Sequence, residues 1–222
     1  MPRKRVKPAP TFTADPEWFA DDDTMSPSQR RIAAAAIEAF AMQGFNGTAT
    51  SDIAKRAGVA EGTIFKYYPT KKKLLIGAVA PLMMRALTPM LRRSVERVLS
   101  ADYATFEDFV IAFARDRLDF AQAHPALLKL LVQEIPFHPE LREHFERIVF
   151  AQVFPLALSA IERFQARKQI RAMPPLTVAR IMGSVIVGYV VSRVFLAPDA
   201  VWDDEREIDT LAGVLARGLR PG

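Results

Sequence analysis

TATSDIAKRAGVAEGTIFKYYPTKKKLL, residues 48–75, is the stretch that decides the fold of the N-terminal part of this chain. It begins with a short amphipathic helix predicted over residues 50–57. The apolar stripe of this helix consists of Ile53, Ala54 and Ala57. We expect the hydroxyl of Thr50 to cap its N-terminus. Gly58 follows directly, at the position where many helices end in a left-handed residue.

A second short helix is predicted directly after this turn, over residues 60–68. Ile64 and Tyr68 are expected to point inward, so the opposite side of the helix faces solvent. Two short helices joined by such a turn form a helix-turn-helix pattern, whose second helix normally enters the major groove of DNA. The pattern, about residues 49–68, therefore predicts DNA binding.

A longer helix is predicted ahead of this motif. Ser26 is a suitable N-cap and Pro27 suits the first helical position. Gly44 is expected to end the helix and Phe45 to fold back on Phe40. The residues expected on the buried face are Ile32, Ala33, Ala36, Ile37 and Phe40.

Residues 28–75 resemble the DNA-binding domain of TetR-family transcriptional regulators. Four features in order carry the resemblance: an alanine-rich helix ending in Gly44-Phe45, the IAKRAGV turn, the TIFKYY helix and a K-x-x-L opening of a fourth helix. The resemblance covers about a fifth of the 222 residues closely and the rest by architecture. It implies an N-terminal domain of residues 26–75 and a helical regulatory and dimerisation domain of residues 76–222.

The resemblance also implies which residues meet DNA. Thr50 and Ser51 would lie where a helix N-terminus meets backbone phosphate, and Lys71 corresponds to the family's usual phosphate contact. The expected surface of the reading helix consists of Glu61, Gly62, Thr63, Phe65, Lys66 and Tyr67.

Three residues depart from the family's pattern. Phe65 replaces a common tyrosine, which removes a hydroxyl but leaves a ring able to contact a thymine methyl group. Ala60 replaces a common serine cap, at a cost of ~1 kcal/mol. Glu61 repels phosphate but is able to accept from a cytosine amino group. These departures affect which operator is read rather than whether DNA is bound.

The rest of the chain reads as helical throughout, so the predicted fold class is all-α. The fourth helix begins at Lys71 and is interrupted by Pro81 and Pro89, so we expect a kink near Pro81. Further helices are predicted over residues 105–124, 126–134, 139–164, 176–196 and 203–219.

This C-terminal half is rich in aromatic residues that are candidates for a small-molecule pocket, which the resemblance implies. The candidate residues are Met83, Met84, Phe106, Phe109, Phe113, Phe120, Phe137 and Phe145. Core packing is the alternative for each of them. Glu134, His138 and His144 are candidate polar anchors, with surface exposure or capping as the alternative.

The last two predicted helices, residues 176–196 and 203–219, are the candidate dimer interface. In TetR-like proteins these helices form a four-helix interface, and two half-sites of a palindromic operator require two reading helices. The alternative is that both helices only complete the intramolecular core.

Composition narrows the remaining possibilities. The chain has no cysteine, three scattered histidines and no glycine-rich phosphate loop, so we expect no metal, no cofactor and no enzymatic activity. The apolar run over residues 181–192 is shorter than the ~20 residues of a membrane span, so a buried helix and a cytoplasmic protein are expected. The basic residues of the N-terminal extension, 1–25, are either a solvated tail or an arm that follows phosphates.

The combined interpretation is a homodimeric DNA-binding regulator that represses transcription and is released by a small apolar effector. Two alternatives remain at this point. One is a regulator without an effector, and the other is a helical protein-interaction module whose helix-turn-helix is only structural.

Overall fold

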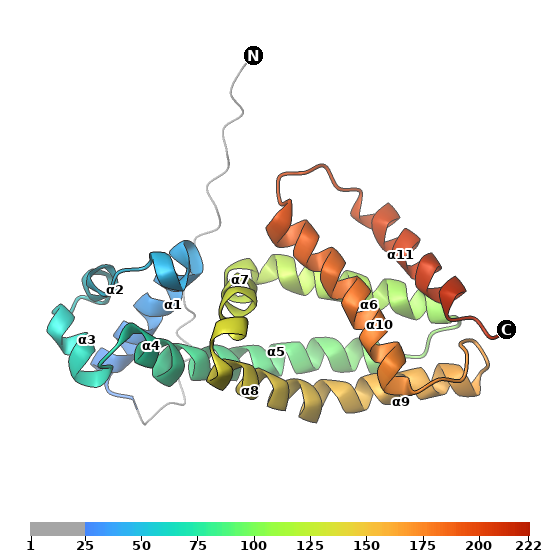
Figure 1. Cartoon of the computed structure of the whole chain (residues 1–222), viewed down its shortest axis with the longest axis horizontal. Coiled ribbons are helices and arrows are strands. Elements are labelled where there is room, and N and C mark those ends of the chain that lie inside the picture. Colours follow the sequence, from blue (N-terminus) through green and yellow to red (C-terminus); the bar gives the residue numbers. More distant parts are fainter. Residues whose placement is uncertain (1–24) are drawn as a thin grey trace, which may run out of the picture. The chain divides into compact units, whose positions relative to one another are not determined.

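The computed structural model describes residues 25–222, without the side chains of residues 83–87, 90, 126, 127, 130, 144 and 148. Every regular element in this range is a helix (Figure 1). The all-α prediction is therefore confirmed. The basic residues of the N-terminal extension lie outside the described residues.

The chain divides into two compact units. Unit 1 takes in the residues up to Ala86 and the segment Lys129–Leu141, and unit 2 comprises Leu87–Leu128 and Arg142–Gly222. Unit 1 is thus larger than the predicted DNA-binding domain of residues 26–75. It also contains the beginning of the following long helix and a segment that comes from much later in the sequence.

Unit 1 is built around one long helix and the predicted helix-turn-helix. Its consecutive elements are α1 (Pro27–Gly47), α2 (Thr50–Ala57), α3 (Glu61–Tyr67), α4 (Lys71–Leu74), the π-helical turn η2 (Leu75–Val79) and the start of α5 (Ala80–Ser100). The helix α1 begins as predicted, with Pro27 at its first position and Ser26 as N-cap. The Ser26 hydroxyl accepts from the Gln29 N–H, and the Gln29 side chain accepts from the Ser26 N–H.

The helix α1 breaks at the glycine predicted to end it, but one further turn continues to Gly47. Gly44 adopts φ 74° and ψ 164°, which interrupts the helix. Phe45 then packs against Phe40, with 5.4 Å between the ring centroids. The five apolar residues predicted for the inner face of α1 are all buried, so this helix forms the base on which the two shorter helices rest.

The predicted kink near Pro81 takes the form of a widened turn. The π-helical turn η2 ends two residues before Pro81, and the N–H of Ala80 donates to the carbonyl of Leu75. A second π-helical turn, η4 (Val149–Val153), ends two residues before Pro155. Since a proline ring crowds the carbonyl four residues earlier, a locally wider turn lets the helix continue through it.

Unit 2 packs its helices around an aromatic core. Its elements are the rest of α5, α6 (Phe106–Ala123), η4, α9 (Phe154–Ala166), α10 (Pro175–Val191), η5 (Ser192–Leu196) and α11 (Asp204–Gly218). The helix α6 packs against α10 and α11, and α10 packs against α9. The rings of Phe106, Phe109 and Phe164 contact one another at centroid distances of 5.2 to 6.1 Å.

Two helical segments pass from one unit to the other. They are α7 (Pro125–Glu134), followed by the 3-10 turn η3 (Ile135–Phe137), and α8 (Pro139–Ile148). The N-terminal part of α7 and the C-terminal part of α8 belong to unit 2, and the part between them belongs to unit 1.

The long apolar helix near the C-terminus is buried on one face only. Val178, Met182 and Ile186 lie in the core of unit 2, but Ile181 and Val185 are 37% and 38% exposed. The helix spans residues 175–196 including η5, so it is long and apolar enough for a membrane span by length and composition alone, as is Pro139–Ala166. The helix was predicted over residues 176–196, close to these bounds, but the expected burial of its apolar run, residues 181–192, holds for one face only, because the helices of unit 2 cover only that face.

Candidate nucleic-acid interface and apolar cavity

The turn between α2 and α3 has the predicted geometry. Gly58 ends α2 with φ 64° and ψ 39°, in the left-handed region. Ile64 and Tyr68 are 1% and 7% exposed, so they anchor α3 to the interior of unit 1. Ala60 precedes α3 without a side-chain capping bond, as expected.

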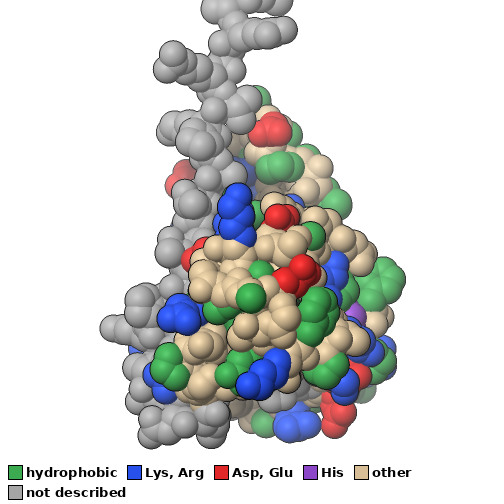
Figure 2. Space-filling model, turned by 90° about the vertical axis from the view of Figure 1, so that its left-hand side faces the viewer, with side chains coloured by type: hydrophobic (Ala, Val, Ile, Leu, Met, Phe, Trp, Pro, Cys, Tyr) green, Lys and Arg blue, Asp and Glu red, His purple; other side chains and the backbone are tan. Residues whose placement is uncertain are grey.

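The opposite face of α3 is free of contacts that would bury it. Glu61, Gly62, Phe65, Lys66 and Tyr67 are exposed and Thr63 is half-buried. Basic, acidic and apolar side chains are interspersed on the end of unit 1 that carries these short helices (Figure 2). The predicted reading residues thus share one solvent-facing surface on a helix whose other face is fixed.

Thr50 does not cap α2 as predicted. The N-cap is Ala49, which makes no side-chain capping bond. Instead the Thr50 hydroxyl donates to the Glu61 carboxylate, with 2.5 Å between Oγ1 and Oε1. This bond ties the first turn of α2 to the first turn of α3. The two residues are far apart in sequence, which is why the pattern alone did not reveal the pair.

Lys71 has an unexpected set of partners. Its Nζ lies 2.7 Å from the carbonyl oxygen of Phe45, 2.9 Å from that of Thr48 and 3.5 Å from that of Asn46. The ammonium group also sits 4.7 Å from the centre of the Phe45 ring. A cation at the C-terminal end of a helix stabilises carbonyls that have no intrahelical partner. Lys71 therefore caps α1 in this structure, rather than extending freely toward solvent.

The two neighbouring lysines differ from Lys71. Lys72 pairs with Glu140 at 3.4 Å, and both side chains are about half exposed. Lys73 is exposed, and its N–H donates to the hydroxyl of Thr70, which caps α4. Sequence reasoning missed this cap, although a threonine directly before a helix is a recognisable signal.

Glu134 and His138 form a buried pair in unit 1. The His138 Nε2 and Glu134 Oε2 atoms are 3.2 Å apart, and both side chains are below 10% exposed. The His138 ring meets the edge of Phe45 at 5.4 Å. Neither residue was expected to be buried, and neither contributes to the apolar cavity of unit 2. The side chain of His144 lies outside the described part of the chain.

Unit 2 contains an apolar cavity of about 230 Å³. Helices α5, α6, α9 and α10 and the turn η4 contribute to its wall. The described lining residues are Leu99, Phe109, Phe113, Arg117, Val149, Val153, Phe154, Ala157, Ile161, Ala179, Met182, Gly183, Ile186 and Val187.

Of the eight predicted pocket residues, Phe109 and Phe113 line this cavity. Phe106 packs beside Phe109 in the core, and Phe120 lies next to His124. Phe145 is half-buried, and the side chains of Met83 and Met84 are not described. Phe137 is 76% exposed in unit 1, so its assignment to an apolar pocket was wrong. Sequence reasoning also missed the α9 and α10 residues, whose spacing is indistinguishable from ordinary core spacing.

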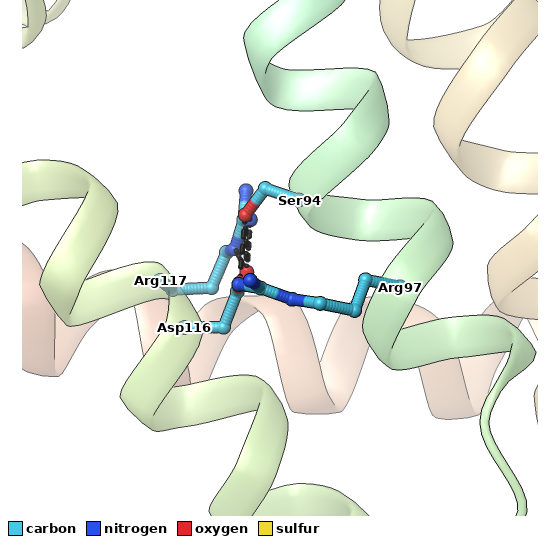
Figure 3. A network of polar contacts seen from close by, with 4 residues as sticks. All are labelled: Ser94, Arg97, Asp116 and Arg117. Atoms are coloured by element: carbon cyan, nitrogen blue, oxygen red, sulfur yellow. Dashed lines mark hydrogen bonds and ion pairs between the residues drawn. The ribbon is translucent and has the colours of Figure 1, made fainter.

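One polar network borders the cavity (Figure 3). The Asp116 carboxylate accepts from the Ser94 hydroxyl at 2.6 and 2.7 Å and from Arg97 at 2.8 Å. It also pairs with the adjacent Arg117. Burial by itself raises the pKa of Asp116, but the hydrogen bonds from Ser94 and Arg117 outweigh it and hold the pKa below its ordinary value.

The sequence profile of the bacterial regulatory proteins of the tetR family matches residues 32–78. The matched range contains most of α1, the whole helix-turn-helix and the start of the fourth helix. The N-terminal domain of the chain is therefore that of the TetR family of DNA-binding transcriptional regulators. Members of this family are regulators and not enzymes. Among the described side chains, no group of three or more histidine and acidic residues is suited to a metal.

Two curated relatives show similarity to part of this chain. The HTH-type transcriptional regulator RutR of Escherichia coli K12 is 25% identical over 111 residues, which are 50% of this chain and 49% of RutR. The Fatty acid metabolism regulator protein of Bacillus subtilis is 44% identical over 50 residues, 22% of this chain and 26% of that protein. The chain thus spans about half the length of the first of these relatives, and less of the second.

The likeness in fold extends further than the likeness in sequence. The crystal structure of FadR from Bacillus subtilis in complex with stearoyl-CoA matches with a TM-score of 0.62 and 21% identity. The match covers 86% of this chain and 99% of FadR. The C-terminal helices of the chain therefore share the fold of that structure.

Proposed function

We propose that this protein is a homodimeric, cytoplasmic transcriptional repressor that binds a palindromic operator and is released from it by a small molecule. The observation that carries the proposal is the exposed face of α3, supported from beneath by buried Ile64 and Tyr68. A reading helix must be held rigidly for its side chains to reach base edges in register.

The side chains on this face suggest which residues contact phosphates and which contact bases. Lys66, together with the N-terminus of α2 at Thr50 and Ser51, would hold backbone phosphates. Glu61, Gly62, Thr63, Phe65 and Tyr67 would face the bases or flanking phosphates. Lys71 would attract a DNA phosphate while it caps α1, since its positive charge stays at the end of that helix.

The cavity of unit 2 supports release by an effector over the alternative of an effector-independent regulator. A ligand that binds the chain in only one of two arrangements shifts the population toward that arrangement. If the favoured arrangement no longer presents two reading helices at the operator spacing, ligand binding and DNA binding oppose each other. The similar fold of FadR, solved with stearoyl-CoA, is consistent with a ligand site in such a domain.

The proposal is tested by measuring the fluorescence anisotropy of labelled DNA from the promoter regions that flank the gene, over a range of salt concentrations. Removing one phosphate contact with Lys66→Ala should weaken binding about tenfold and lower the salt slope by about one. Arg147→Ala, removal of a solvent-exposed charge on α8, is the matched control and should leave both unchanged.

A chain that binds none of these fragments, or binds them with a salt dependence that Lys66→Ala does not alter, would contradict operator binding. That outcome would favour the helical protein-interaction module. Tight binding that no ligand weakens would contradict only the effector-released part of the proposal.

A further inference from the structure

The wall of the unit 2 cavity is almost wholly apolar, but one charged residue lies on it. Among the described lining residues, Arg117 is the one that carries a charge. Its side chain is 14% exposed, which is low for an arginine. Burying a cation next to an apolar cavity is costly unless an anion compensates it. The charges around Arg117 therefore indicate whether a ligand in the cavity should carry a negative charge.

The internal counter-ion of Arg117 is shared. Asp116 pairs with Arg117 and also with Arg97, and it accepts from the uncharged Ser94 as well. Two guanidinium groups and one carboxylate leave a net charge of +1 in this network. The side chain of Arg97 is 76% exposed, so water solvates its positive charge. The side chain of Arg117 is largely shielded from solvent, so its charge is not solvated in this way.

The guanidinium of Arg117 has donors to spare. Its Nε and Nη2 donate to Asp116, and Nη2 also donates to Ser94. Its Nη1 has no acceptor among the described residues. A planar guanidinium is suited to hold two oxygen acceptors at once, and its hydrogen bonds to a carboxylate are among the stronger ones in proteins.

Aromatic rings hold this group at the cavity wall. The guanidinium carbon lies 5.6 Å from the centre of the Phe113 ring and 5.4 Å from that of Phe120. Phe113 itself lines the cavity. A ligand whose apolar part contacts Phe113 would thus have its polar end close to Arg117.

We propose that the effector is an amphipathic anion, with a carboxylate bound by Arg117 and an apolar body in the cavity of unit 2. This inference rests on the proposed function of that cavity as an effector site. It replaces the purely apolar effector expected from the sequence. A cavity of 150 Å³ holds a benzene molecule, so 230 Å³ accommodates a body of about nine non-hydrogen atoms.

The same network connects ligand binding to α5. Ser94 and Arg97 lie on α5, whereas Asp116 and Arg117 lie on α6. A ligand carboxylate competes with Asp116 for Arg117, so its binding weakens one tie between the two helices. Since α5 is the helix by which the chain enters unit 2 from unit 1, the effector would act on an element common to both.

The experiment compares two probes of the same chain length, octanoate and 1-octanol, by isothermal titration calorimetry at pH 7.5 on the full chain. A charge-assisted hydrogen bond contributes about 1.5–3 kcal/mol, so octanoate should bind the wild type at least about tenfold more tightly than 1-octanol. Arg117→Met should abolish this preference by weakening octanoate binding to the level of 1-octanol binding. Arg115→Met, on the same helix but not among the lining residues, should keep the preference.

For a second variant we expect tighter octanoate binding, the opposite change. This distinguishes the proposal from a folding defect. Asp116→Asn removes the internal competitor of the ligand while keeping both arginines. We expect octanoate to bind this variant about tenfold more tightly than the wild type, because the ligand carboxylate no longer competes with Asp116. A misfolded variant would lose affinity for both probes instead.

Equal binding of the two probes by the wild type would overturn the anion proposal and leave the cavity as an apolar effector site. A preference for octanoate that survives Arg117→Met would also overturn it, since the charge would then act from elsewhere. Binding of neither probe would overturn the effector role of the cavity as well, while operator binding is measured independently through Lys66.

Discussion

At the scale of single residues, Lys71 shows how context changes the role of a charged side chain. In the sequence it stands in a run of three lysines at a helix start, where cations are mildly unfavourable. In the structure its ammonium group reaches the carbonyls at the end of α1. The first lysine of the run is therefore a structural residue, whatever it contributes to DNA binding.

Lys71→Met should lower the free energy of unfolding by about 2 kcal/mol, because it leaves the carbonyls at the end of α1 without their charged donor. Lys72→Met is the matched control. Its ion pair with Glu140 is solvent-exposed, so a change within about 0.5 kcal/mol is expected. Urea denaturation followed by circular dichroism measures both, and equal losses in the two variants would contradict the capping role.

Asp116 makes the stability of the protein depend on pH in the acid range. Its pKa is lower in the folded protein than in the unfolded chain, so the unfolded chain binds the proton more readily. The stabilisation is complete above the unfolded pKa, at about pH 4, and is lost as the pH falls through the folded pKa.

Asp116→Asn should therefore lower the unfolding free energy at pH 7 by about 2 kcal/mol, since the hydrogen bonds of a buried charged group are weakened. The difference between the wild type and this variant should shrink below about pH 4. Chemical denaturation at pH 7, 5 and 3 measures this difference. A constant difference over that range would show that Asp116 is not the group responsible.

At the scale of elements, the helix-turn-helix contains two glycines whose backbone conformations differ. Gly58 ends α2 in the left-handed region, whereas Gly62 lies within α3. Neither position has a neighbouring atom within 4 Å of an added Cβ. A side chain added at either glycine would therefore meet no steric clash. The effect of a substitution on stability depends only on the backbone conformation at that glycine.

Gly58→Ala should destabilise the protein by about 1 kcal/mol, because a Cβ is unfavourable in the left-handed region. Gly62→Ala should stabilise it by about 0.5–1 kcal/mol, because alanine loses less backbone entropy in a helix. Thermal unfolding without DNA measures both changes. Shifts of the same sign in the two variants would contradict the assigned conformations.

At the scale of the whole molecule, α10 is the element that unit 2 leaves incomplete. Leu176, Ile181, Val185 and Val187 are exposed along the helix, while its opposite face packs in the core. An exposed apolar stripe of this kind marks an interaction surface. The proposed dimer uses this stripe, with the same face of each copy meeting across a two-fold axis.

Val185→Asp should weaken dimerisation at least about 30-fold, the effect of losing some 2 kcal/mol at an interface centre. Val201→Asp is the control, since Val201 is fully exposed in the loop between α10 and α11. Sedimentation velocity at several concentrations distinguishes the two. Monomers in the wild type, or an unchanged dimer in Val185→Asp, would contradict an interface on α10.

The sequence alone was sufficient for the helices and for the motif that leads to the family. The N-cap Ser26, the left-handed Gly58 and the inward-facing Ile64 act over a few residues, so their roles follow from local spacing. The face of α3 offered to DNA follows from the same periodicity, because a residue on a helix opposite a buried one is exposed.

The tertiary structure decided the roles that depend on distant partners. Thr50 meets Glu61, Lys71 meets the end of α1, and one aspartate lies between two arginines beside a cavity. Apolar residues of α9 and α10 have the same spacing whether they fill a core or line a cavity, so periodicity cannot separate the two. Local spacing fixes which face of a helix is apolar, whereas only packing determines what that face meets.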